Sequence, residues 1–215
     1  MKRSLFAGFL LLAVSVSAIS DDEATLTTSA EAPPETLSGA IKETLRLQGH
    51  TVAINGTPTA TLWFRSELPV RSEASNELGV SFGNLVESIF VGAVRLDSTW
   101  RDYKGNPVEA GLYTMRYAIQ PADGNHMGVS LYRDFLLLIP ADGDTNPDAE
   151  FDHDKVVSMS MDPAKLTHPS VLALFPVWEG VEVPALQKND MDQWMLAMSF
   201  GALNLGLTVT GKGEH

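Results

Sequence analysis

The sequence predicts an all-β fold, a single antiparallel β-sandwich or jelly-roll-like domain with few short helices. Three observations indicate it. Several segments of strand length alternate apolar and polar residues, which is typical of strands with one buried face. Asn55-Gly56 separates two extended segments, a sequence typical of a tight hairpin turn. Turn-forming residues recur at short spacing, so the chain accommodates about six to nine strands and little helix.

The first part of the predicted domain contains one ambiguous segment and one clear hairpin. A short helix over residues 40–47 is one interpretation, with Ser38 near its start and Gly49 as its stop. An opening strand in "TLRLQ" is the other interpretation. In the second arm of the hairpin, alternation places three apolar side chains on one face. These are Ala60, Leu62 and Phe64.

Three further strands are predicted between the hairpin and residue 140. The first lies in "SIFVGAVRLDSTW", and the last, "RDFLLLIP", is a short, continuous apolar run of strand length. Between them "LYTMRYAIQP" has a clean period of two. Its apolar face consists of Tyr113, Met115, Tyr117 and Ile119.

The C-terminal third is predicted mainly from alternation. "KVVSMSMD" alternates like a strand, whereas "HPSVLALFPVW" is interpreted as holding a short helical turn. Bulky residues are even-numbered before Gly201 and odd-numbered after Ala202. Such a slip of one residue predicts a β-bulge or a tight turn between two strands. The two sets are Trp194, Leu196, Met198 and Phe200, then Leu203, Leu205, Leu207 and Val209.

The N-terminus predicts export. Lys2 and Arg3 precede an apolar stretch over residues 5–14, and small residues lead to a cleavage site after Ala18. Residues 1–18 are therefore interpreted as a signal peptide, with an uncleaved anchor as the alternative, although the stretch is short for a bilayer. After cleavage no transmembrane anchor remains, and the protein is expected in the periplasm or outside the cell. Residues 19–35 are predicted to be a disordered acidic linker, followed by the β-sandwich domain over residues 36–215.

Composition excludes several classes of function. The chain has 215 residues, no cysteine and a formal net charge of -12, with 27 acidic against 15 basic residues. Disulfides, thiolate metal sites and cysteine nucleophiles are therefore excluded. An acidic surface repels phosphate backbones, so nucleic acid is not expected as a partner.

Polar residues are concentrated in "QPADGNHMGVSLYRDFLLLIP", residues 120–140. His126 is the candidate acid, base or metal ligand, with Asp123 or Asp134 as its carboxylate partner. The candidate ligand-binding side chains of this loop are Asn125, Tyr132 and Arg133. The alternative is a structural loop, because turn-forming side chains and buried polar groups need hydrogen-bond partners in any fold.

Two other groups of residues extend the candidate site. Trp100, Asp102 and Tyr103 form a turn that is expected to neighbour the loop, and exposed rings there or at Trp178 would suit a carbohydrate ligand. The acidic loop "ADGDTNPDAEFDHD" spaces Asp142, Asp144 and Asn146 as calcium ligands are spaced, and His126 is a further candidate metal ligand. Proline and histidine replace the glycine and glutamate of an EF-hand loop, so a solvated acidic loop is the alternative. The sequence identifies no cofactor.

The segments "WRDY" and "EAGLYTMRYAIQPADGNHMGVSLYRDFLLLIPA" resemble a group of exported bacterial proteins of unassigned activity. That group shares a tryptophan-aspartate-tyrosine turn, a "GxYTxRY" strand, a "QPxDGxHMG" loop and an "RDFLLLxPA" strand. The resemblance covers about residues 50–140 well and the remainder loosely. It implies export and a single β-rich domain, and it implies no reaction or ligand.

The first functional hypothesis is a non-enzymatic binding or cell-envelope-associated module with a protein or glycan ligand, because no complete catalytic set is recognisable. A hydrolase or metal-dependent enzyme that uses His126 is the first alternative, and a carbohydrate-binding module is the second. The histidines His50, His126, His153 and His168 are scattered along the chain, so only folding can gather them.

Overall fold

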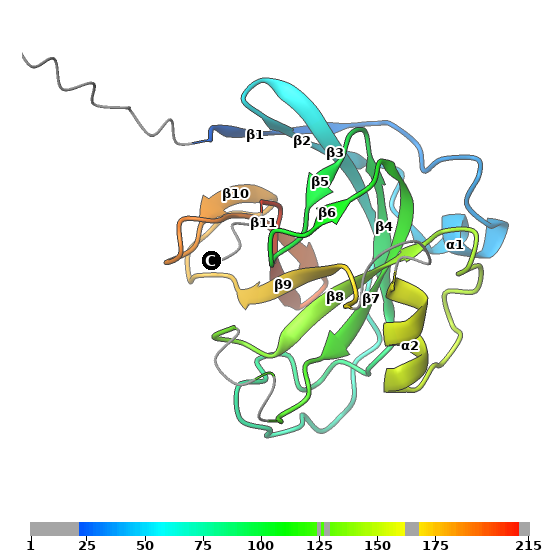
Figure 1. Cartoon of the computed structure of the whole chain (residues 1–215), viewed down its shortest axis with the longest axis vertical. Coiled ribbons are helices and arrows are strands. Elements are labelled where there is room, and N and C mark those ends of the chain that lie inside the picture. Colours follow the sequence, from blue (N-terminus) through cyan, green and yellow to red (C-terminus); the bar gives the residue numbers. More distant parts are fainter. Residues whose placement is uncertain (1–21, 124–125, 127–129, 162–167, 211–215) are drawn as a thin grey trace, which may run out of the picture.

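The computed structural model describes residues 22–123, 126, 130–161 and 168–210, and strands dominate it (Figure 1). The strands are β1 (Ala24–Ser29), β2 (Gly49–Ile54), β3 (Thr57–Phe64), β4 (Phe90–Leu96), β5 (Trp100–Arg101), β6 (Pro107–Val108), β7 (Gly111–Ile119), β8 (Asp134–Pro140), β9 (Val171–Pro176), β10 (Ala185–Lys188), β11 (Trp194–Phe200) and β12 (Leu203–Thr208). The described helices are α1 (Gly39–Thr44) and α2 (His153–Ser160).

A single antiparallel sheet contains most of these strands. Its ten members follow the order β1-β2-β3-β4-β7-β8-β9-β12-β11-β10, and β5 pairs with β6 in a separate hairpin. The predicted all-β antiparallel class with few short helices is confirmed. Because β9 pairs with both β8 and β12, the two halves form one continuous, strongly curved sheet instead of two separate ones. The sheet nearly closes: β1 contacts β10, and Trp194 Nε1 donates to the Asp22 carbonyl at 2.8 Å.

The concave face of this sheet encloses the main hydrophobic core. The predicted inward faces are confirmed, because the alternating apolar residues of β3, β7, β11 and β12 all lie in or against this core. The hairpin at Asn55-Gly56 is confirmed as well, with both residues at positive φ. The predicted slip at Gly201 is a tight turn between β11 and β12, where Gly201 has a φ of 69°.

The two helices cover the outside of the sheet. Helix α1 begins after Ser38, whose hydroxyl accepts from the Ile41 backbone N–H as an N-cap. This confirms the helical interpretation of the first segment, although the helix ends at Thr44. Helix α2 packs on β8 and β7, so the outer face of β8 is buried too, which explains its continuous apolar run.

Three predictions of local structure are wrong. "KVVSMSMD" lies mostly in helix α2, because Asp152 caps the helix through Lys155 N and because Val156 and Met159, three residues apart, face the sheet. "HPSVLALFPVW" contains strand β9 and no helical turn, since both of its faces are buried. The predicted disordered linker contains strand β1, which pairs with β2 along its whole length, so the folded domain begins before residue 36.

Some predictions fall outside the described residues. The signal peptide, its cleavage site after Ala18 and the candidate Asn125 are among them. Within the described part, neither helix has the length and apolar composition that crossing a bilayer requires.

His50 makes the attachment of β1 sensitive to pH. Its ring is buried, and its Nδ1 lies 3.1 Å from the hydroxyl of Thr28 on β1. Burial, and to a lesser extent the Arg46 charge, lower the pKa of His50 below the ordinary value of 6.5. Below about pH 6.5, His50 binds a proton more readily in the unfolded chain than in the folded chain, so acidification favours unfolding. We expect Tm to fall between pH 7.5 and pH 5, and to fall less in His50→Leu; equal falls in both proteins would contradict this role.

Candidate functional site

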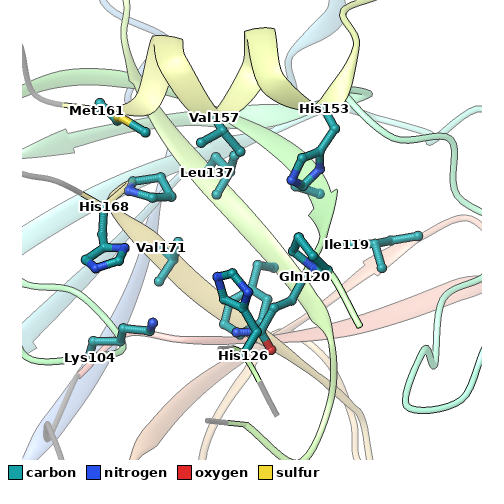
Figure 2. Close-up of a pocket in the computed structure, with 14 residues that line it drawn as sticks. Lys104, Ile119, Gln120, His126, Leu137, His153, Val157, Met161, His168 and Val171 are labelled. Carbon is teal, nitrogen blue, oxygen red and sulfur yellow. The ribbon is translucent and has the colours of Figure 1, made fainter. Parts of the chain in front are cut away.

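A cleft of about 290 Å³ lies between helix α2 and the outer face of the sheet. Its floor and walls are apolar, and its edge carries a lysine, a glutamine and three histidines. The lining residues are Lys104, Ala118, Ile119, Gln120, Pro121, His126, Phe135, Leu137, His153, Val157, Met161, His168, Pro169 and Val171. Figure 2 shows Leu137 and Val157 between the helix and the sheet, with the histidines around them. The volume is at the lower end of the range for small-molecule sites.

Three of the scattered histidines are gathered here by the fold. His126 comes from the loop after β7, His153 opens helix α2 and His168 precedes β9. In Figure 2, His153 lies on one side of the cleft and His168 on the other, while the ring of His126 points up toward the helix from below. Among the described residues, no three histidine or acidic side chains are grouped closely enough to hold a metal ion. The three histidines are therefore placed to contact a ligand in the apolar cleft individually, and not to hold a metal ion together.

Two of these histidines have carboxylate partners. His126 Nδ1 lies 2.7 Å from Asp123 Oδ1, and the backbone N–H of His126 donates to the same oxygen at 3.1 Å. His153 Nδ1 lies 3.0 Å from Glu87 Oε1, which also accepts from the Ile119 N–H. Each carboxylate fixes the orientation of its ring, so the structure brings together the predicted pair of Asp123 and His126.

A more polar hollow continues from the cleft past His153. It measures about 300 Å³ and is more open to solvent than the cleft itself. Arg133 lines this hollow, and its guanidinium donates from Nε to the Gln120 carbonyl at 2.7 Å and from Nη1 to Glu77 at 3.2 Å. This predicted binding residue is thus engaged in holding two loops together.

Asp134 does not partner His126. It is fully buried, where Oδ1 accepts from the Tyr117 hydroxyl at 2.7 Å and from Phe82 N at 3.1 Å. Its Oδ2 accepts from Ser81 N at 2.7 Å. The predicted pairing of Asp134 with His126 is wrong, because these bonds hold Asp134, at the head of β8, against the loop at residues 81–82 and against Tyr117 of β7.

The turn that contains Trp100, Asp102 and Tyr103 is buried as well. Trp100 is 7% exposed and its Nε1 donates to the Val209 carbonyl, so it forms no surface platform. Asp102 Oδ1 accepts from the backbone N–H of Lys104 and Asn106, and burial raises the pKa of Asp102. The ring of Tyr103 packs edge-on against Phe135. The prediction that these three side chains bind a ligand directly is therefore wrong, since the fold itself occupies them.

Among the described residues, a large exposed aromatic ring lies elsewhere. Trp178 is 52% exposed and borders a small groove of about 110 Å³ together with Tyr132 and Met191. The predicted binding residue Tyr132 thus lies in this groove, where its ring packs edge-on against Phe175. A carbohydrate ligand at Trp178 stays a prediction.

The acidic loop over residues 141–154, whose spacing resembles that of a calcium site, binds a buried arginine. Both oxygens of Asp144 accept from the buried guanidinium of Arg116, at 2.7 and 2.8 Å, and the Asn146 carbonyl accepts from Arg116 Nη2 at 2.7 Å. Asp142 is exposed, and it is not part of any described cluster that could hold a metal. Asp144 and the Asn146 carbonyl are thus bound to Arg116, so the geometry of the described residues gives the predicted metal site no support.

Sequence reasoning missed Lys104, and it left His153 and His168 unassigned. Lys104 follows the buried Asp102 in a tight turn, where it looks like an ordinary surface lysine. The sequence around Lys104 does not indicate a binding site, because the cleft forms only when α2 packs across β7 and β8. Comparisons with family models, curated proteins and solved structures found no match to this chain.

Proposed function

We propose that this protein is an exported, non-enzymatic binding module, and that the cleft beneath α2 holds a small ligand with an apolar body. The observation that carries the proposal is the cleft's construction: a concave apolar floor with a few convergent polar groups at its edge, which is the usual composition of a small-molecule site. Phe135, Leu137 and Val171 form part of this floor and belong to a second buried hydrophobic cluster, which also contains Val156 of α2. Export is inferred from the N-terminal segment, residues 1–18, with its basic residues, apolar stretch and small residues.

The alternative of a hydrolase has less support from the geometry. The two histidine-carboxylate pairs are suited to proton transfer. However, no serine, threonine or cysteine is among the described residues that line the cleft, so His126 has no nucleophile beside it there. Binding explains the apolar floor, which a histidine-dependent hydrolase does not require.

Filling the cleft from the helix tests the proposal. The neutral dye N-phenyl-1-naphthylamine fluoresces in apolar sites, and we expect it to bind the wild type saturably. Val157→Trp places an indole in the cleft and should weaken dye binding at least tenfold, or by about 1.4 kcal/mol. Ser158→Trp, on the exposed side of the same helix, is the matched control and should bind like the wild type. Fluorescence titration measures all three proteins.

Two outcomes would refute the proposed function. One is a wild-type protein that shows no saturable dye fluorescence. The other is equal dye affinity in Val157→Trp and Ser158→Trp. Thermal unfolding of both variants, expected within a few degrees of the wild type, separates a filled cleft from a damaged fold.

A further inference from the structure

We propose that the ligand of this cleft is an amphipathic monocarboxylate, whose carboxylate is bound by Lys104 and His168 while its apolar chain lies on the floor. The proposal rests on the function proposed above and names the chemical class of the ligand.

The charge of Lys104 has no partner within the described part of the chain. Its side chain lines the cleft, and within the described part of the chain its ammonium forms no ion pair or hydrogen bond. Lys42 and Lys188 show the contrast, since each pairs with a nearby carboxylate. A chain with a net charge of -12 offers many acidic partners. A lysine left free at the edge of an apolar cleft is therefore complementary to an anionic ligand.

The fold holds Lys104 in this position. The Tyr103 N–H donates to the Val171 carbonyl at 2.9 Å, and the Lys104 N–H donates to the buried Asp102 at 2.9 Å. The first bond attaches the turn between β5 and β6 to the start of β9, and the second holds the turn in its own conformation. Because Val171 also lines the cleft, the ammonium of Lys104 is carried on a backbone that is fixed directly beside the apolar floor.

His168 supplies the second polar group, an imidazole that can donate a hydrogen bond. Its exposed side chain forms no hydrogen bond with any described residue, unlike His126 and His153, which face their own carboxylates. Figure 2 places Lys104 and His168 on the same side of the cleft and His153 on the opposite side. The cleft thus has one end that favours an anion, and the apolar surface of Val171, Leu137 and Val157 extends from that end beneath the helix.

The charge pattern favours a singly charged carboxylate over a phosphate. No arginine lines the cleft, so the fork that suits phosphate groups is missing from its described lining. The strongly negative chain also opposes a dianion more than a monoanion. One ammonium and one imidazole match the two oxygens of a single carboxylate.

The experiment compares octanoate with 1-octanol, which have chains of the same length and differ in charge. Each displaces N-phenyl-1-naphthylamine from the full-length protein at low salt. We expect octanoate to displace the dye at a concentration at least fivefold lower than 1-octanol. Lys104→Gln should remove most of this preference and His168→Gln part of it. Lys155→Gln is the matched control, because it changes the net charge equally on an exposed lysine outside the cleft lining.

The outcomes separate this inference from the function on which it rests. Equal displacement by octanoate and 1-octanol, with the dye bound, overturns the carboxylate assignment and leaves the cleft as a binding site. A preference that Lys104→Gln and Lys155→Gln reduce equally also overturns it, since it then reflects net charge alone. If the wild type does not bind the dye at all, the proposed function itself fails.

Discussion

Arg116→Met is expected to lower the free energy of unfolding by about 3–5 kcal/mol. Arg116 is fully buried and donates to Asp144 through Nε and Nη2, and to the Ser88 and Ala149 carbonyls through Nη1. Methionine fills much of the volume but leaves the Asp144 carboxylate buried, with the Thr114 hydroxyl as its remaining side-chain donor among the described residues. Removing one partner of a buried ion pair is costly because the other charge stays uncompensated. Urea unfolding with linear extrapolation measures the change.

The matched control for this variant is Arg65→Met. Arg65 pairs with Asp148 at 3.2 Å, but the carboxylate is largely exposed, so the loss should be less than about 1 kcal/mol. The double variant Arg116→Met, Asp144→Leu should recover part of the loss, since it removes the orphaned charge as well. If Arg116→Met unfolds at the same urea concentration as Arg65→Met, the buried pair does not stabilise the loop as described.

This ion pair shows why the acidic loop was misinterpreted from sequence. Alternating Asp142, Asp144 and Asn146 are compatible with a calcium loop, a solvated loop or a loop bound to an internal cation. Arg116 lies on β7, on the face opposite the apolar one. In a strand with one buried face, this opposite face is normally exposed to solvent. Only the packing of the loop over the outer side of β7 makes this position a buried one. The decisive contact joins residues far apart in the chain, which no local pattern encodes.

The parts of the fold that depend on local pattern were predictable. The hairpin at Asn55-Gly56, the N-cap at Ser38 and the turn at Gly201 each follow from a few adjacent residues. Helix α2 was missed because its eight residues satisfy a period of two as well as a helical period, and tertiary contact with β8 decides between them. The cleft could not be predicted either, because helix α2 forms the side of the cleft that faces the sheet.

The site was predictable only in part. Asp123 and His126 are three residues apart in one turn, so their contact could be anticipated. His153, His168 and Lys104 reach the same cleft from a helix, a strand start and a hairpin turn. Asp134 was grouped with His126 because the two are close in sequence. The pleat of β8 decided otherwise, since it turned the aspartate inward to the loop at residues 81–82.

Asp134→Asn is expected to lower the free energy of unfolding by about 2–4 kcal/mol. Both carboxylate oxygens accept hydrogen bonds, from Ser81 N on one side and from Phe82 N and the Tyr117 hydroxyl on the other. An asparagine amide must direct its NH₂ group at one of these donors, whichever way it is oriented, so at least one buried donor loses its acceptor. Urea unfolding at pH 7 measures the loss.

Tyr117→Phe is the graded control, because it removes one donor and leaves the carboxylate bound to two backbone amides. Burial and the neighbouring Asp134 charge raise the pKa of Tyr117, so its hydroxyl remains a donor throughout the accessible pH range. We expect this variant to lose about 1 kcal/mol. Dye binding by the folded fraction of Asp134→Asn should match the wild type, since Asp134 does not line the cleft. Unchanged stability with weakened dye binding would instead place Asp134 in the site beside His126. If Asp134 only holds a loop to a strand, its replacement can weaken ligand binding only by destabilising the fold, so stability would fall as well.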